Sequence, residues 1–204
     1  MENKRKWIIC ISCLVLFALA TILVLVKQTA LMDDMVYDYL ISFKSPGVTS
    51  YCKFMTFWAN TLTLIVLSAL ALIPIIFKNR TGIYLVSMLV ITVIVNQSFK
   101  YLVARARPEG ISLIIETGHS FPSGHSMAAV SFYGFIIWLL QKSSLNTKLK
   151  WITTGLLTFL IINVCLSRVY LGVHYFSDVL AGALLSLSLL IIVTHVLKGK
   201  GWGV

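Results

Sequence analysis

The sequence predicts an all-α integral membrane protein, a bundle of six transmembrane helices with a short interfacial helical segment between the first and second. Hydrophobic residues make up 58% of the 204 residues, against roughly 45–50% in soluble domains, and the mean hydropathy is +0.91. Apolar runs close to the ~20 residues that span a bilayer recur along the chain. Short basic clusters separate these runs, as the positive-inside rule predicts for a multi-pass protein.

The first apolar run follows the basic residues Lys4, Arg5 and Lys6, so a cleaved signal peptide is the alternative to a first span. The run is longer than the usual signal-peptide core of about 7–15 residues, and no small-residue cleavage site follows it. We therefore expect an uncleaved helix. The length fits one membrane domain, with spans at about 7–26, 54–77, 83–103, 124–140, 151–166 and 179–197.

The segment between the first two spans is more polar, yet it carries a regular apolar stripe. Leu31, Met35, Tyr39 and Phe43 recur every four residues. This period is typical of an amphipathic helix, and such a helix lies flat at a membrane surface with its apolar face in the lipid.

The distribution of charge predicts the orientation. Six spans put both termini on one side, and ten of the 17 Lys and Arg residues then fall on that side. Every acidic residue except Glu2 falls on the other. We expect both termini in the cytoplasm and the polar segments 100–125 and 167–178 at the extracytoplasmic face of the cell membrane.

Composition also weighs against other classes of protein. The net charge is +10, but the basic residues lie between apolar runs rather than on one face, which disfavours nucleic acid as a partner. Cys10 and Cys13 form C-x-x-C inside an apolar run without neighbouring ligands. We interpret the four cysteines as buried free thiols, with neither a disulfide framework nor a metal site.

The segment 167–178 concentrates charged side chains between two apolar runs. His174 and Asp178 are four residues apart, so they can share one face of a helical turn. The carboxylate then orients the ring, as in enzymes that use histidine as a nucleophile or base. Arg168 adds a cation nearby. Taken alone, this segment is equally well a short loop with chance polar residues.

The segment 100–125 supplies more cations on the same side. Lys100 and Arg107 are seven residues apart, so we expect them on one face of a helix that Pro108 ends or bends. Snorkelling of cations at helix ends accounts for Lys100 or Arg105 but not for the histidines beside them. Lys100, Arg107 and Arg168 would repel one another without an anion between them, and phosphate suits arginine forks best.

The residues before the fourth span predict an anion-binding helix start. Pro122 and Ser123 have the residue types favoured just before and at a helix N-terminus. The free backbone N–H groups of Ser123 and Gly124 would point at the anion there. An ordinary helix start is the alternative.

These three segments also carry a family pattern. Residues 100–108 read K-x6-R-P, 122–125 read P-S-G-H, and 167–178 read S-R-x5-H-x3-D. In this order they resemble the three motifs of the type 2 phosphatidic acid phosphatase superfamily, and every fixed position is met. The six-span pattern and small size resemble the bacterial membrane members, phosphatidylglycerophosphatase B among them.

The resemblance implies a role for each motif residue. His174 is the expected nucleophile, forming a phosphohistidine that water then hydrolyses, and Asp178 orients it. His125 is the expected general acid for the leaving alkoxide. The residues expected to hold the phosphoryl oxygens are Lys100, Arg107, Ser123, Gly124 and Arg168. No metal or other cofactor is expected.

The resemblance further implies a lipid phosphate phosphatase whose substrate enters from the bilayer. Phosphatidylglycerophosphate, converted to phosphatidylglycerol, is the expected substrate; undecaprenyl pyrophosphate, phosphatidate and lysophosphatidate are alternatives. A soluble-substrate phosphatase or haloperoxidase and a small membrane transporter are the other classes. Outside the motifs, we expect Glu116 and His119 to be solvated loop residues, with lining of the site entrance as the alternative, and Arg105 to snorkel.

Overall fold

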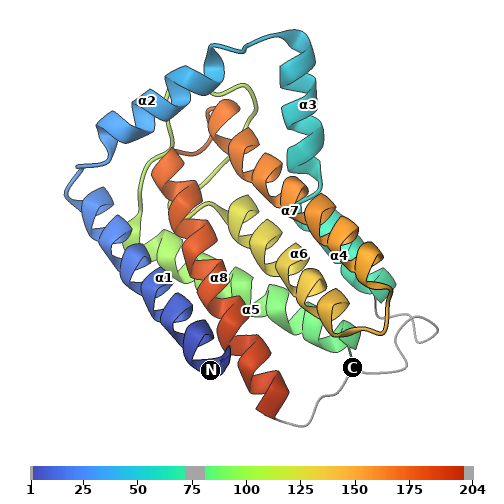
Figure 1. The fold of residues 1–204 in the computed structure, drawn as a ribbon. Coiled ribbons are helices and arrows are strands. Elements are labelled where there is room, and N and C mark those ends of the chain that lie inside the picture. The colour runs from blue at the N-terminus through green and yellow to red at the C-terminus, as the bar shows by residue number, and fades with distance from the viewer. Residues whose placement is uncertain (1, 72–80, 200–204) are drawn as a thin grey trace.

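The computed structural model describes residues 2–71 and 81–199, and these residues form helices and loops without a strand. The all-α class is therefore confirmed. The described residues form eight helices, arranged as a bundle (Figure 1). In chain order they are α1 (Glu2–Leu25), α2 (Ala30–Ile41), α3 (Pro46–Phe57), α4 (Thr61–Ala71), α5 (Thr81–Val103), α6 (Gly124–Lys142), α7 (Thr147–Tyr170) and α8 (Phe176–Gly199).

The bundle is organised around α6, which packs against α5, α7 and α8, while α1 lies along α8 (Figure 1). Phe132 and Phe135 of α6 are fully buried against Met88 of α5 and Val164 of α7. Burial of such side chains contributes about 1.5–3 kcal/mol each in water. In lipid, close packing supplies the stability instead.

Length and apolar composition identify four helices that can cross a membrane: α1, α5, α7 and α8. The pair α3 and α4 gives a fifth if it is one span, broken by a bend of 46°. The chain is a multi-pass membrane protein, but these criteria do not reach the six spans expected from the sequence.

The predicted second span, at about 54–77, contains a break between two helices in its described part. Helix α3 ends at Phe57 and α4 begins at Thr61. Between them the side chain of Asn60 accepts a hydrogen bond of 3.0 Å from the Leu62 N–H. An asparagine that satisfies a backbone donor in this way competes with helix continuation. Residues 72–77 of this span, and Lys78 and Arg80 of the basic turn, lie outside the described residues.

The helix boundaries near the polar segments agree closely with the expected ones. Helix α5 ends at Val103 and α6 begins at Gly124, as predicted. Helices α7 and α8 extend beyond the predicted spans at both ends. Only residues 171–175 therefore separate them, which makes the turn between α7 and α8 short.

Helix α2 crosses the end of the bundle at an angle to the other helices (Figure 1). Leu31, Met35 and Tyr39 point away from the protein, with 75%, 63% and 67% of their surface exposed, and Phe43 continues this stripe just beyond the helix. Asp33, on the opposite face, is only 2% exposed. The predicted helix with an apolar outer stripe is therefore present, although its inner face holds a buried carboxylate.

Candidate active site

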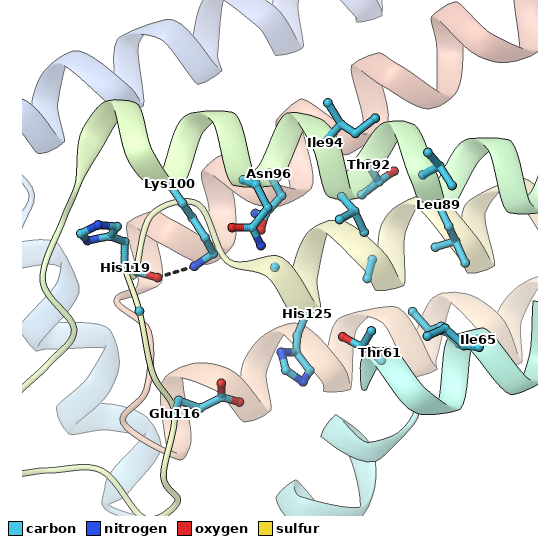
Figure 2. Close-up of a pocket in the computed structure, with 18 of the residues that line it drawn as sticks. Thr61, Ile65, Leu89, Thr92, Ile94, Asn96, Lys100, Glu116, His119 and His125 are labelled. Atoms are coloured by element: carbon cyan, nitrogen blue, oxygen red, sulfur yellow. Dashed lines mark hydrogen bonds between the residues drawn. The ribbon is translucent and has the colours of Figure 1, made fainter.

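The polar residues singled out from the sequence converge at one end of the bundle, around a cavity of about 940 Å³. Lys100, Arg107, Gly124, His125 and His174 line this cavity. Arg168, Asp178 and Ser123 are fully buried around it without lining it. Figure 2 shows Lys100 reaching into the cavity from α5 and His125 from the first turn of α6.

His174 and Asp178 are in contact, but not on one helical turn as expected. His174 lies in the turn before α8, and Asp178 is the third residue of that helix. The Asp178 Oδ2 atom accepts a 3.0 Å hydrogen bond from the Tyr175 N–H, as in a helix N-terminal capping arrangement. It also lies 3.6 Å from His174 Nδ1. Capping of α8 thus brings the carboxylate to the ring.

The remaining contacts of the His174 ring determine its tautomer. Arg107 Nη1 lies 3.2 Å from His174 Nε2, and a guanidinium only donates. Nε2 therefore accepts, and Nδ1 carries the proton toward Asp178 and toward Ser120 Oγ, 3.3 Å away. Burial lowers the pKa of His174 to about 4, against the opposing hydrogen bond to Asp178. The ring is neutral at physiological pH, and its Nε2 lone pair faces the Arg107 guanidinium.

Arg107 does not share a helix face with Lys100, because α5 ends before it. Ala104, directly after the helix, has a φ of 48°, a left-handed conformation that stops helical continuation. Arg107 lies in the following loop and reaches the cavity from there. The expected meeting of Lys100 and Arg107 at one site is therefore present, but chain reversal after α5 produces it.

The cations at the cavity are bonded to the loop segment 116–119. Arg107 donates to the carbonyl oxygens of Thr117 and Gly118, at 3.0 and 3.1 Å. Lys100 donates to the carbonyl oxygen of His119 (Figure 2). These carbonyls hold the two cationic groups against the same loop segment.

Arg168 is the most deeply buried cation of the site, with none of its surface exposed. It donates to Thr56 Oγ1 at 2.7 Å and to Glu116 Oε1 at 2.5 Å. Among the described residues, its Nε has no hydrogen-bond partner. The expectation that Glu116 is merely solvated is wrong, because Glu116 pairs with Arg168 and lines the cavity, as His119 also does.

Ser123 caps α6 as predicted, its Oγ accepting from the Ser126 N–H at 3.4 Å. Its own N–H is not free, because it donates to the Asp178 carbonyl oxygen at 3.0 Å. This bond ties the start of α6 to α8. A Cβ on Gly182 would lie 2.9 Å from the Ser123 carbonyl oxygen, so only glycine permits the contact. Gly124, the next residue, lines the cavity.

Arg105 does not snorkel. Its guanidinium pairs with Asp178 Oδ1 at 2.6 Å and with Asp33 Oδ2 at 2.9 Å. Two residues of this cluster were not predicted: Asp33, and Ser120, which donates to Asp178 Oδ2. The only signal for Asp33 in the sequence was its position opposite the apolar stripe of α2. Asp34 and Asp38 on the same helix made that position indistinct.

Away from the cations, the cavity extends between α4 and α5 and is lined by apolar side chains. Figure 2 shows Ile65 of α4 facing Leu89 of α5, with Lys100, Glu116 and His125 toward the other end. The further apolar lining residues include Leu64, Val90, Val93 and Ile94. The site thus joins a cationic end with two histidines to a long apolar cleft.

Comparison with curated proteins found relatives of known type. The chain is 40% identical to phosphatidylglycerophosphatase B of Bacillus subtilis over 104 residues, which cover 49% of this chain and 50% of that protein. It is 35% identical over 118 residues to undecaprenyl-diphosphatase of Sulfolobus acidocaldarius, covering 54% and 53% of the two chains. The chain spans about half the length of the curated relatives it matches.

Solved structures extend the likeness to most of the fold. The crystal structure of a transmembrane PAP2-type phosphatidylglycerolphosphate phosphatase from Bacillus subtilis superposes with a TM-score of 0.87 and 25% identity, over 93% of this chain and 96% of that one. Aquifex aeolicus LpxE shares the fold, with a TM-score of 0.66, 18% identity, and coverage of 79% and 93%. The PAP2 superfamily model matches residues 81–202, which contain all three motifs and most of the cavity. The chain belongs to the PAP2 superfamily.

Proposed function

We propose that the protein is a membrane lipid phosphate phosphatase that cleaves a phosphomonoester through a phosphohistidine. The observation that carries this proposal is the cavity, which has cations and histidines at one end and apolar walls along α4 and α5. Its volume of about 940 Å³ lies at the upper end of the roughly 300–1,000 Å³ of ligand pockets. A headgroup phosphate and part of an acyl chain fit this polarity.

The first chemical step uses the His174 Nε2 lone pair. Nε2 attacks phosphorus, the bond between phosphorus and the lipid oxygen breaks, and His125 donates a proton to the departing alkoxide. The ring becomes positively charged as the new bond forms, and the Asp178 carboxylate 3.6 Å from Nδ1 stabilises that charge. Before attack, Arg107 transfers its hydrogen bond from Nε2 to a phosphoryl oxygen.

The second step regenerates the enzyme. His125, now neutral, accepts a proton from water, which attacks phosphorus, and the bond to Nε2 breaks to release phosphate. Lys100, Arg107, Arg168 and the start of α6 at Gly124 stabilise the phosphoryl oxygens in both steps. The proposed contribution of Ser123 is its cap of α6, since its N–H is bonded to Asp178.

The six-span architecture belongs to this proposal: α6, the fourth span in chain order, joins α1, the α3–α4 pair, α5, α7 and α8. Helix α6 has 19 residues and extends about 28 Å at ~1.5 Å per residue, close to the ~30 Å of a bilayer core. It carries buried polar residues such as Ser126 and Ser131 because it is surrounded by protein rather than lipid. A helix in that position does not need a uniformly apolar surface.

The orientation is likewise proposed: both termini cytoplasmic and the site extracytoplasmic. The rings of Trp7 and His195 lie 5.1 Å apart, so the beginning of α1 and the end of α8 are neighbours, at the opposite end of the bundle from the site (Figure 1). The excess of basic residues on that side supports a cytoplasmic location. The stripe on α2 would then lie in the outer membrane surface.

Phosphatidylglycerophosphate is the proposed substrate, on the strength of the Bacillus relative. Undecaprenyl pyrophosphate is the second candidate, because the Sulfolobus relative is an undecaprenyl-diphosphatase. The deciding experiment measures phosphate release in detergent from these two lipids, phosphatidate and lysophosphatidate. It compares the wild type, His174→Ala and a control variant, His195→Ala.

We expect the highest kcat/KM with phosphatidylglycerophosphate, a loss of about 10³-fold or more in His174→Ala, and near-wild-type turnover in His195→Ala. Substantial activity in His174→Ala would refute the nucleophile assignment. A higher kcat/KM with undecaprenyl pyrophosphate would make that lipid the substrate in place of phosphatidylglycerophosphate. Absence of phosphate release by the wild type from every lipid would refute the phosphatase itself.

A further inference from the structure

Arg105 bridges two buried carboxylates from different parts of the chain. Its Nη1 lies 2.6 Å from Asp178 Oδ1 and its Nη2 lies 2.9 Å from Asp33 Oδ2. The two acidic side chains are 0% and 1% exposed, and that of Arg105 is 16% exposed. Both carboxylates are thus shielded from water, which strengthens their interaction with the shared guanidinium.

Asp33 is held in this position by the start of α8. Its Oδ1 accepts the Ser177 N–H at 2.7 Å, and its Oδ2 accepts the Ser177 hydroxyl at 2.8 Å. The guanidinium carbon of Arg105 lies 3.9 Å from the Tyr175 ring centroid, in a cation–π arrangement. The cluster therefore has few alternative arrangements, and α2 fixes one side of it.

The two oxygens of Asp178 have separate partners. Oδ1 bonds to Arg105, whereas Oδ2 faces His174 Nδ1 and accepts from Tyr175 N and Ser120 Oγ. Arg105 consequently fixes the rotation of the carboxylate that leaves Oδ2 toward the ring. A lysine in its place would supply one point charge and not a planar fork that reaches both acids.

Asp33 also sets the net charge of the cluster. Arg105 paired with Asp178 alone would neutralise the carboxylate that has to stabilise positive charge on the His174 ring. Asp33 draws on the same guanidinium, so that the three groups together carry one negative charge. That net charge favours the cationic ring formed as Nε2 attacks phosphorus.

Neither Asp33 nor Arg105 lines the cavity, and both are bonded instead to residues at the start of α8, Ser177 and Asp178. We propose that Asp33 and Arg105 are positioning residues for the phosphatase reaction, acting through Asp178 on the His174 nucleophile. The inference rests on the proposed function and adds a segment, α2, that lies outside the three motifs and outside the matched residues 81–202. Helix α2 becomes part of the catalytic apparatus rather than a connector.

The test compares Asp33→Asn with Asp34→Asn, its exposed neighbour on α2, in full-length protein in detergent with phosphatidylglycerophosphate. Asp33→Asn keeps the shape and removes the charge. We expect kcat to fall roughly 10- to 100-fold, the scale of a hydrogen bond to a charged group, with KM within about threefold of wild type. Asp34→Asn should keep wild-type kcat and KM. Equal kcat values in the two variants would overturn the proposal.

A double-mutant cycle separates positioning from a merely structural role. If Asp33 acts through Asp178, adding Asp33→Asn to Asp178→Asn causes no further loss of kcat. If the double variant instead loses kcat by the product of the two single losses, Asp33 acts independently of Asp178. That result would overturn the inference even if Asp33→Asn alone lowers kcat. Arg105→Lys should retain more kcat than Arg105→Gln but less than wild type; full rescue by lysine would exclude the bridging role.

Failure of the proposed function gives a different result. A wild type that releases no phosphate from any lipid removes the reaction, and with it this inference. An active wild type that is sensitive to His174→Ala but indifferent to Asp33→Asn keeps the phosphatase and removes only the positioning residues.

Discussion

Arg107 donates its guanidinium N–H to His174 Nε2 across 3.2 Å. The nitrogen proposed to attack phosphorus is therefore covered by a cation proposed to bind the phosphoryl group. In the proposed mechanism, substrate binding exchanges the His174 acceptor of Arg107 for a phosphoryl oxygen, and this exchange frees Nε2 to attack.

Replacement of Arg107 should reduce turnover even though it removes the guanidinium from His174 Nε2. We expect Arg107→Ala to lower kcat/KM by about 10²–10³-fold, the scale for one donor to developing charge. Arg107→Lys should recover only part, because lysine lacks the fork. Lys148→Ala, an exposed cation at the opposite end, serves as the control. Wild-type kcat/KM in Arg107→Ala would contradict the proposed contact with phosphate.

His125 as general acid predicts a dependence on the leaving group. His125→Ala should lose about 10²–10⁴-fold with lipid phosphates, whose alkoxides need a proton. The loss should be much smaller with p-nitrophenyl phosphate, whose phenolate leaves unprotonated. The measurement compares kcat/KM of both substrates in wild type and variant. Equal losses would mean that His125 serves another purpose.

The low pKa of His174 predicts a dependence of stability on pH. Burial lowers this pKa from its ordinary value of 6.5 to about 4. Between these values the unfolded chain binds a proton that the folded chain does not, so stability falls as pH drops below 6.5. At pH 5 the cost is about 2 kcal/mol.

A His174→Asn variant lacks this group in both states and isolates its effect. We expect its melting temperature in detergent to fall less than that of the wild type between pH 7.5 and pH 5. The other three histidines are common to both proteins. Parallel melting curves across this range would contradict a neutral, buried His174.

The close approach of α8 to Ser123 predicts sensitivity at Gly182. A Cβ there would lie 2.9 Å from a backbone oxygen and 3.2 Å from Met127 Cγ. Gly182→Ala should therefore push α8 away and lower both activity and melting temperature. Gly155→Ala on α7, where a Cβ meets nothing within 4 Å, should be neutral or stabilise by up to about 1 kcal/mol.

The orientation predicts which loops are reachable from outside. In a variant whose native cysteines are replaced, Ile115→Cys should react with a membrane-impermeant thiol reagent in sealed cells, since Ile115 is 96% exposed near the site. Leu145→Cys, 43% exposed between α6 and α7, should react only after permeabilisation. The reverse pattern would invert the topology.

The sequence was sufficient for the positions of α6 and the end of α5 because their boundary signals are local. Ser123 caps its own helix, and a cap is visible in the residues that form it. The four-residue spacing predicted the pairing of His174 with Asp178, and the turn before α8 produces this pairing by a route other than the expected shared helix face.

The wrong predictions for Arg105 and Glu116 arise from contacts between distant segments. Arg105 was expected to snorkel because its partners, Asp33 and Asp178, lie 72 and 73 residues away along the chain. Glu116 was expected in solvent because periodicity carries no information about Arg168, 52 residues further on. The broken second span depended on one side chain, Asn60, inside an otherwise apolar run.

The two faces of α2 have a consequence for the medium in which the protein is studied. Leu31, Met35 and Tyr39 are mostly exposed on the outer side, while Asp33 on the inner side holds Arg105. In the proposed orientation, the bilayer covers this stripe and so supports the helix that holds Asp178 in place. The kcat should therefore change with lipid packing at the outer surface even when the phosphate substrate is held constant. Phosphatase activity would then report on the physical state of the surrounding lipid.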